Sequence, residues 1–324
     1  MQRRVIGLVG LLCSLCCIKA HCQESNLGEE YLYRPKFFQF TLTQLPESRV
    51  AFRPENGLGT APEQSEDNRE ISTKLRIPLK MSGKLKLVSE LKYKNEFVSL
   101  RPSVETEDWE RVDFRNAGIS LFYDYQINDT YYLMGHLGAN KQGDEIGQVQ
   151  LDVAANYGAS ILLGKHTSEI CRVGFGLKVG NNLGRFNVIP IFMYNRKMGN
   201  RVYLDLILPK QAQVRYAFSR KFFGFFSAEA DGSNFAFTGL HGDEVLEYRR
   251  RQVDFKFGFE YEIHDWLWMG ANVGYALPIN SVIVNKGDRT RNQIHNFGTN
   301  GSTVANISLF MVPPRSLFAK LKNH

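Results

Sequence analysis

Three side chains of the types that acyl transfer needs fall at spacings that neighbouring strands could bring together: Ser120, His136 and Asp152. In such a set the serine attacks, the histidine takes the serine proton, and the carboxylate orients the histidine. They become neighbours only if two hairpins adopt particular registers, because a shift of two residues would keep each on the same face and separate them. The required registers pair Gln126 with Thr130 and Asn140 with Gln148. An outer-membrane hydrolase using this set is therefore an alternative hypothesis.

Charged residues at alternate positions form a second set that could act on a ligand, here by attracting or orienting charged and polar solutes. We predict that they face the interior of a barrel. Near balance between bases and acids predicts a lumen without strong selectivity for anions or cations. Pairing between them would brace the wall. The hairpin from Lys74 to Lys92 is rich in bases and the strand after Val253 is rich in acids, which predicts a transverse field that orients polar solutes. The bases are Lys74, Arg76, Lys80, Lys86, Lys92, Arg172, Lys178, Arg215 and Lys256, and the acids are Glu90, Asp124, Asp152, Asp205, Glu229, Asp254, Glu260 and Glu262.

No other catalytic or cofactor pattern occurs in the sequence. It has no His-Glu-x-x-His, Walker or dinucleotide glycine motif, and its histidines lack metal-ligand spacing. We therefore predict no catalytic metal and no cofactor. The formal net charge of +7 falls to 7 − 3 = +4 if residues 1–22, with Arg3, Arg4 and Lys19, are removed. That small excess does not indicate a nucleic-acid partner.

Long runs of alternating apolar and polar residues are the elements that must position these side chains. Residues 148–163 and 253–263 show the pattern most clearly. A period of two predicts strands with one apolar and one polar face. Runs of nine or more residues match a tilted strand that crosses a bilayer, whereas strands of globular domains are usually shorter. The length of these runs in this chain of 324 residues therefore favours a membrane β-barrel.

The connections between these runs alternate in length, as expected for outer-membrane barrels with short periplasmic turns and longer outer loops. The longer connections include residues 95–114, 141–147, 231–247 and 278–302. With a first strand at Phe37–Thr43, the count is about 14 antiparallel strands in an up-and-down barrel, and 12 is the alternative. A soluble periplasmic β-sandwich that binds a ligand is a further alternative. Aromatic residues favour the barrel because they cluster near strand ends, as interfacial belts do: Tyr93, Tyr123, Tyr125, Tyr131, Tyr194, Tyr261, Trp266 and Tyr275.

The first 22 residues have the layout of a secretory signal peptide. Arg3 and Arg4 precede an apolar segment, and small residues at Ala20 and Cys22 suit cleavage before Gln23. Lipidation at Cys22 is the alternative to simple cleavage. Residues 23–324 then form the barrel domain, with Cys171 as the one cysteine left, so that no internal disulfide is expected.

The segment Leu204–Lys210, followed by Val214–Phe218, resembles an uncharacterised family of outer-membrane β-barrels from Gram-negative bacteria. Residues 257–261 and Gly274-Tyr275 are also similar to it. The resemblance implies a barrel fold and an outer-membrane location, and it implies no substrate. We therefore predict an exported outer-membrane barrel whose partners are membrane lipid and small polar solutes. Its expected role is a passive channel, or a structural or binding barrel, and not an enzyme.

Overall fold

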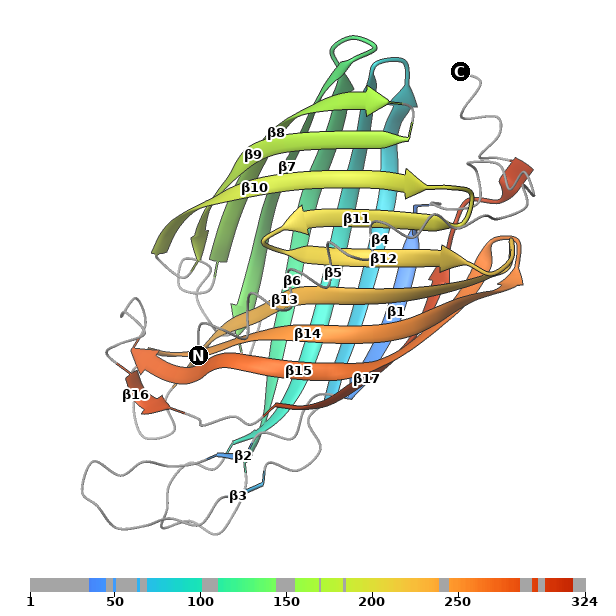
Figure 1. Cartoon of the computed structure of the whole chain (residues 1–324). Helices are drawn as coiled ribbons and strands as arrows, with labels where there is room; N and C mark the ends of the chain where they lie inside the picture. The colour runs from blue at the N-terminus through green and yellow to red at the C-terminus, as the bar shows by residue number, and fades with distance from the viewer. Residues whose placement is uncertain are drawn as a thin grey trace, which may run out of the picture.

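A computed structural model describes residues 35–44, 49–50, 63–64, 69–100, 110–143, 155–168, 170–182, 185–238, 245–285, 293–296 and 301–316. Within these ranges the chain is almost entirely β-strand (Figure 1). The predicted signal peptide and its cleavage site lie outside the described residues. No helix in the described part of the chain is long and apolar enough to cross a membrane.

Fourteen strands form a closed antiparallel barrel in which each strand pairs with its neighbours in sequence. The first and last strands close the ring, with Phe38 opposite Met311 and Gln44 opposite Ala305. The predicted fold class and the count of 14 are confirmed. The barrel strands are β1 (Phe38–Gln44), β4 (Arg69–Ser82), β5 (Leu85–Leu100), β6 (Glu110–Gln126), β7 (Tyr131–Gly143), β8 (Ala155–Ser168), β9 (Cys171–Asn182), β10 (Arg185–Met198), β11 (Val202–Leu208), β12 (Gln211–Ala217), β13 (Phe222–Thr238), β14 (Val245–His264), β15 (Leu267–Asn285) and β17 (Ser302–Met311).

Three short strands lie outside the ring. The strands β2 (Arg49–Val50) and β3 (Glu63–Gln64) pair with each other in the connection between β1 and β4. The strand β16 (Gln293–Asn296) extends the far end of β15. All three short strands lie at the same end of the barrel, here called the loop end (Figure 1).

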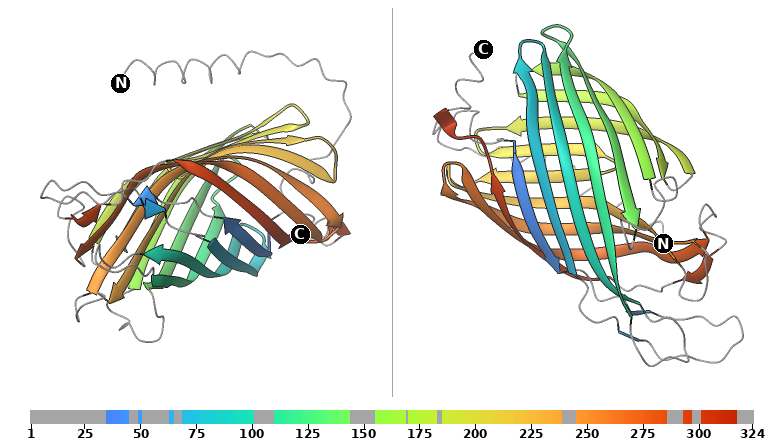
Figure 2. Two further views of the ribbon diagram at one scale, coloured as in Figure 1. Left: turned by 90° about the horizontal axis from the view of Figure 1, so that it is seen from below. Right: turned by 180° about the vertical axis from the view of Figure 1, so that it is seen from behind.

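Tight turns join the strands at the opposite end, here called the turn end. The turn after Ser82 contains Gly83 and the turn after Met198 contains Gly199, with φ of 60° and 63° respectively. These left-handed conformations suit glycine because it has no Cβ. The long strands β4–β7 lie side by side on the face of the barrel opposite the β11–β12 hairpin (Figure 2).

The alternation in sequence predicts correctly which face of each strand points outward. Large apolar side chains are exposed at every second position, for example Leu75 and Ile77 on β4 or Ile161 and Leu163 on β8. A closed barrel leaves these side chains exposed because the membrane, and not a second sheet, covers them. The polar residues between them consequently point into the lumen.

The register of β4 corrects the predicted position of Lys80. A register shift between Pro78 and Lys80 places Lys80 opposite Leu87 instead of Lys86, so that Lys80 joins the outward face. Proline cannot donate a backbone hydrogen bond, and it is therefore found at such irregularities in sheets. The other predicted lumen bases on this hairpin keep their inward positions.

All four of the longer predicted connections are partly strand, and two of them show this most clearly. Residues 231–238 continue β13 and pair with β14 from Val245 onward, although Asp231-Gly232-Ser233-Asn234 has the composition of a loop. Similarly, β5 continues to Leu100 and β6 begins at Glu110. Pairing along two long neighbouring strands outweighs the low strand preference of these residues.

The β11–β12 hairpin is much shorter than its neighbours. Both strands have seven residues, and they are joined by a tight turn at Pro209-Lys210, which follows a cis Leu208–Pro209 peptide bond. β11 pairs with β10 only as far as Phe192, and β12 pairs with β13 only as far as Glu229. Among the described residues, therefore, no strand adds to the sheet beside β10 before Phe192 on that side, or beside β13 at residues 231–235. We call this interruption of the wall the side break (Figure 1).

Candidate functional site

Apart from Lys80, the charges that the alternation in sequence assigns to the lumen line it, as far as they lie in the described residues; Asp152 lies outside them. Their neighbours divide them into two groups, which lie at different heights in the barrel. One group forms ion pairs that cross the loop end of the lumen. The other group is basic and lies below it. The two groups have different chemical capacities.

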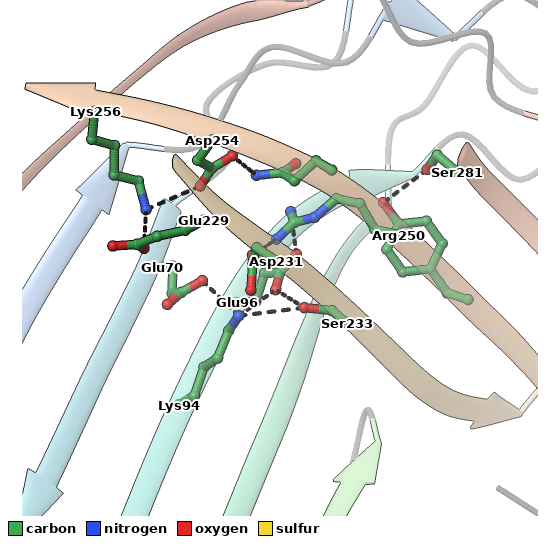
Figure 3. Close-up of polar contacts among 12 residues, drawn as sticks. Glu70, Lys94, Glu96, Glu229, Asp231, Ser233, Arg250, Asp254, Lys256 and Ser281 are labelled. Atoms are coloured by element: carbon green, nitrogen blue, oxygen red, sulfur yellow. Dashed lines mark hydrogen bonds and ion pairs between the residues drawn. The ribbon is translucent and has the colours of Figure 1, made fainter. Parts of the chain in front are cut away.

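An ionic cluster crosses the lumen near the loop end, and we call it the outer bar (Figure 3). Glu96 on β5 contacts Arg250 on β14 at 2.5 Å and accepts a hydrogen bond from Ser233 on β13. Lys94 on β5 lies 2.7 Å from Glu70 on β4 and also donates to Ser233. Because β5 and β14 lie on opposite walls, these contacts join the two walls directly.

The outer bar is deeply buried, and each of its bases contacts at least one carboxylate. Glu96 is 0% exposed, and Lys94 and Arg250 are each 7% exposed. Asp231 contacts Arg250 at 3.7 Å and so adds a second carboxylate to this guanidinium. Charges buried to this extent are tolerated only when they are paired. The bar therefore holds the walls together and obstructs the lumen.

An aromatic stack reinforces the bar. The ring of Phe114 on β6 stacks on Phe235 of β13 at 4.6 Å between centroids and on Tyr248 of β14 at 5.5 Å. Beside it, Ala236 on β13 pairs in parallel with Gly143 on β7. The loop end therefore contains a smaller ring, made of β13, β14, β15, β17, β1, β4, β5, β6 and β7, from which β8–β12 are excluded.

Four lysines below the outer bar form the second group, and we call them the lysine compartment. Lys74 on β4 and Lys92 on β5 are paired across their strands, so that two like charges lie side by side. Lys178 points inward from β9, and Lys210 stands in the β11–β12 turn beside the side break. Coulombic repulsion connects Lys74 with Lys92, and Lys210 with each of the other three.

The carboxylates nearest to these lysines are already engaged elsewhere. Glu90 acts on Lys74 through its charge, but it accepts a hydrogen bond from Arg76 at 2.7 Å. Glu70 and Asp231 act on Lys92, yet they contact Lys94 and Arg250 of the outer bar. Among the described residues, no carboxylate lies within ion-pair distance of any of the four lysines. The compartment is therefore a concentrated positive charge with unused hydrogen-bond donors.

The inner wall beside the lysine compartment is apolar. Tyr132 on β7, Leu162 on β8 and Met193 on β10 are buried against one another, and Met134, Ile191 and Ile207 pack on them. Ile189 continues this surface along β10 to the side break, where it is 38% exposed and pairs with Lys178. The lumen thus presents an apolar wall next to a basic one.

Most of the remaining predicted charges are paired, several of them near the turn end. Glu260 contacts Lys36 at 2.7 Å and Arg215 at 3.4 Å, and Glu262 accepts from Arg315. Arg172 lies 3.6 Å from Asp124 and covers the Tyr132 ring. Elsewhere Lys256 contacts Glu229 and Asp254, each at 3.1 Å, and Asp205 accepts from Asn195. Lys86 points inward near the turn end. Phe223, Trp268 and Phe310 pack together inside this end.

The registers required for the predicted Ser-His-Asp set are wrong. Ser120 pairs with Gly138, and His136 pairs with Phe122 and Ser160, because Gln126 lies opposite Tyr132 rather than Thr130. The β7–β8 hairpin pairs Asn140 with Asn156 rather than Gln148. Ser120 and His136 remain diagonal neighbours that both lean over Gly138. Asp152 lies outside the described residues.

The described residues contain no group of three or more His, Cys, Asp or Glu side chains that could hold a metal ion. Cys171 is a free thiol at the start of β9. Neither the role of Lys210 nor the outer bar was predicted from the sequence. Lys210 follows a proline in an apparent loop, and the bar depends on which residues meet across the lumen.

Comparison with known families gives a match to a domain of unknown function, DUF6268, over residues 27–300. The chain belongs to this family. Since the match covers most of the chain, the predicted membership of an uncharacterised barrel family is confirmed. A search of curated proteins finds no match.

Several solved outer-membrane proteins share the fold at low identity. The toluene transporter TodX of Pseudomonas putida is 9% identical with a TM-score of 0.36, covering 86% of this chain and 90% of that chain. Outer membrane phospholipase A of Escherichia coli is 11% identical with a TM-score of 0.31, covering 90% and 95%. LpxR of Salmonella typhimurium is 6% identical with a TM-score of 0.34, covering 85% and 99%. These likenesses concern the fold alone.

Proposed function

We propose that this protein is an outer-membrane barrel that binds small anionic solutes in the lysine compartment and admits them through the membrane under the control of the outer bar. The observation that carries this function is the convergence of Lys74, Lys92, Lys178 and Lys210 without a carboxylate at ion-pair distance among the described residues. The family match assigns no activity, so the proposal rests on this geometry.

Lys74 and Lys92 are half-buried side by side, and placing like charges together in this way is costly unless an opposite charge offsets it. Every other lumen base described above except Lys86 contacts a carboxylate, which shows that the fold has acids available to neutralise bases. Near this compartment the acids are turned toward the outer bar or toward Arg76 instead. An anion bound between the lysines would supply the missing opposite charge.

The near balance of bases and acids in the whole lumen does not reveal that four of the bases lie together. The sequence predicts an interior without strong charge preference, because it counts all inward charges together. In the structure these charges lie at different heights. Apart from Asp205, whose carboxylate accepts a hydrogen bond from Asn195, the described lumen charges without an ion-pair partner are basic. We therefore propose anion preference where composition alone favours none.

Equilibrium binding of radiolabelled inorganic pyrophosphate to the protein in phosphatidylcholine nanodiscs at low salt tests this function. We expect saturable binding by the natural chain and a loss of about a hundredfold or more in affinity for Lys74→Gln combined with Lys178→Gln, since each of the two lost charge-assisted contacts contributes about 1.5–3 kcal/mol. Lys84→Gln, in an exposed turn, removes the same charge outside the lumen and is the matched control.

Absence of saturable binding by the natural chain would contradict the proposal. Equal affinity in the double variant and in Lys84→Gln would also contradict it, because the binding would then arise from general surface charge.

A further inference from the structure

We propose that the side break is a lateral port through which a single-chain amphiphile with an anionic head reaches the lysine compartment from the membrane. This inference deepens the proposed function, since it takes the compartment as the site of the head group and names the class of ligand. The break itself is established by strand pairing and does not depend on that function.

The break lies at a height that the membrane must cover. A membrane-crossing strand needs about 9–11 residues at the usual tilt, and β11 and β12 have seven each. The turn at Pro209-Lys210 therefore stands inside the apolar layer and not beyond it. The neighbouring strands β10 and β13 continue past the turn, and no other strand of the described part of the chain lies beside them on that side.

Unpaired strand edges are unfavourable in hydrocarbon, because their backbone groups find no water there. β10 reduces this cost with Pro190, which has no N–H group and lies in the unpaired stretch. A hairpin longer by a few residues would have closed the wall. The retained break therefore requires polar groups, water or a ligand head beside it, and Lys210 is one such group.

The surroundings of the break fit an amphiphile with one anionic head. On the inner side, Ile189 and Ile191 lead to the buried apolar cluster of Leu162 and Met193. Lys178 pairs directly with Ile189, and Lys210 stands at the lower border of the break. A head held by these two lysines would place its chain along the apolar wall or back through the break.

The outer surface also leads to the break. An apolar groove of about 780 Å³ crosses the outward face of seven consecutive strands. It ends at Phe186 on the unpaired stretch of β10, a side chain that is 72% exposed. The groove offers an acyl chain a continuous apolar path to this position. Its lining includes Leu79, Ser89, Ile119, Leu137, Tyr157, Val179 and Phe186.

The loop end offers no equally direct route. The outer bar and the stack of Phe114, Phe235 and Tyr248 fill the ring that the contact between Ala236 and Gly143 closes. The lysine compartment lies below this obstruction and beside the break. Lateral movement through the break therefore avoids disrupting buried ion pairs.

Photocrosslinking tests the port directly. We would place benzoylphenylalanine at Ile189, beside the break, or at Val88, which faces the lumen from the opposite wall. Each protein is reconstituted in phosphatidylcholine vesicles that contain a small fraction of labelled dodecyl phosphate. We expect labelling at Ile189 to exceed labelling at Val88 by about fivefold and to fall by a similar factor with Lys178→Gln and Lys210→Gln, as charge-assisted contacts are lost.

Equal labelling at the two positions would overturn the port, as would labelling that is unchanged by the lysine variants. Labelled dodecyltrimethylammonium, with a cationic head, is the matched probe and should not distinguish the positions. A third arm uses a variant in which β11 and β12 are each lengthened by four residues, so that the hairpin closes the break. Its first added inward-facing residue is a lysine, which keeps the positive charge of the compartment. We expect it to abolish labelling at Ile189 while pyrophosphate binding continues.

The arms separate the two proposals. Pyrophosphate binding without preferential dodecyl phosphate labelling at Ile189 would refute the port and leave the anion site intact. Labelling at Ile189 that depends on the lysines, in a protein that does not bind free pyrophosphate, would support the port and refute a site for free anions. If the lengthened hairpin does not fold, the two crosslinking positions and the lysine variants still decide the question.

Discussion

The outer bar and the lysine compartment are built from the same residue types and face the same lumen, but only one of them is neutralised. In the bar, Lys94 contacts Glu70 and Glu96, and Arg250 contacts Glu96 and Asp231. In the compartment, Lys74 and Lys92 are paired with each other across two strands. A buried charge with a partner holds the structure together, whereas one without a partner is available to a ligand. The distinction depends on contacts across the lumen.

The largest effect is expected from removing the central carboxylate of the bar. Glu96→Ala leaves the Arg250 guanidinium without its 2.5 Å partner in a fully buried position. Breaking a buried pair costs about 3–5 kcal/mol. Urea titration of the refolded protein, followed by heat-modifiable gel migration, should show a loss near the lower figure because Asp231 remains beside Arg250. A free energy of unfolding within about 0.5 kcal/mol of the natural chain would contradict a structural role for the bar.

A pair of lysine substitutions compares the two regions directly. Lys94→Met should destabilise the barrel by about 2 kcal/mol, because Glu70 and Glu96 lose their buried counter-charge. Lys74→Met should be neutral or stabilising by up to about 1 kcal/mol, since it relieves repulsion with Lys92. The same urea titration measures both variants. The comparison between the regions fails if Lys74→Met is as destabilising as Lys94→Met.

The smallest effect is expected at Ser120. Ser120 lies opposite Gly138 and is only a diagonal neighbour of His136. Ser120→Ala should therefore leave the hydrolysis of ester and phospholipid substrates by the detergent-solubilised protein unchanged, together with its stability. The measurement uses equal amounts of folded protein and compares initial rates. A rate that falls by about a hundredfold or more in this variant would establish nucleophilic catalysis in the lumen.

Much of the fold follows from the sequence, because a period of two fixes which face of each strand points outward. The alternation placed Lys178 and Arg215 in the lumen without knowledge of their partners. Register does not follow in the same way, since every shift by two residues preserves the alternation. For that reason the predicted neighbours of His136 were wrong although its inward orientation was right.

The outer bar and the side break depend on contacts that local patterns do not encode. Asp231-Gly232-Ser233-Asn234 has a loop composition, so the strand that carries two bar residues was missed. Pro190 and Pro209 were the available signals for the break, because proline inside a barrel strand or at a hairpin tip indicates an edge. The short spacing between turns from residue 202 to residue 217 was a further signal, because it leaves room for strands of only about seven residues.

The central claim is that the unpaired lysines, and not the paired charges of the bar, determine what the lumen accepts. The most direct test is the reversal potential of single channels in a planar bilayer with a tenfold KCl gradient. Glu96→Gln combined with Arg250→Gln removes the bar without leaving a buried charge from this pair unpaired. We expect this variant to conduct in discrete steps with a reversal potential that favours chloride, and the preference should disappear when Lys74→Gln and Lys178→Gln are added. A potential that favours potassium, or one that the lysine substitutions do not change, would contradict the account.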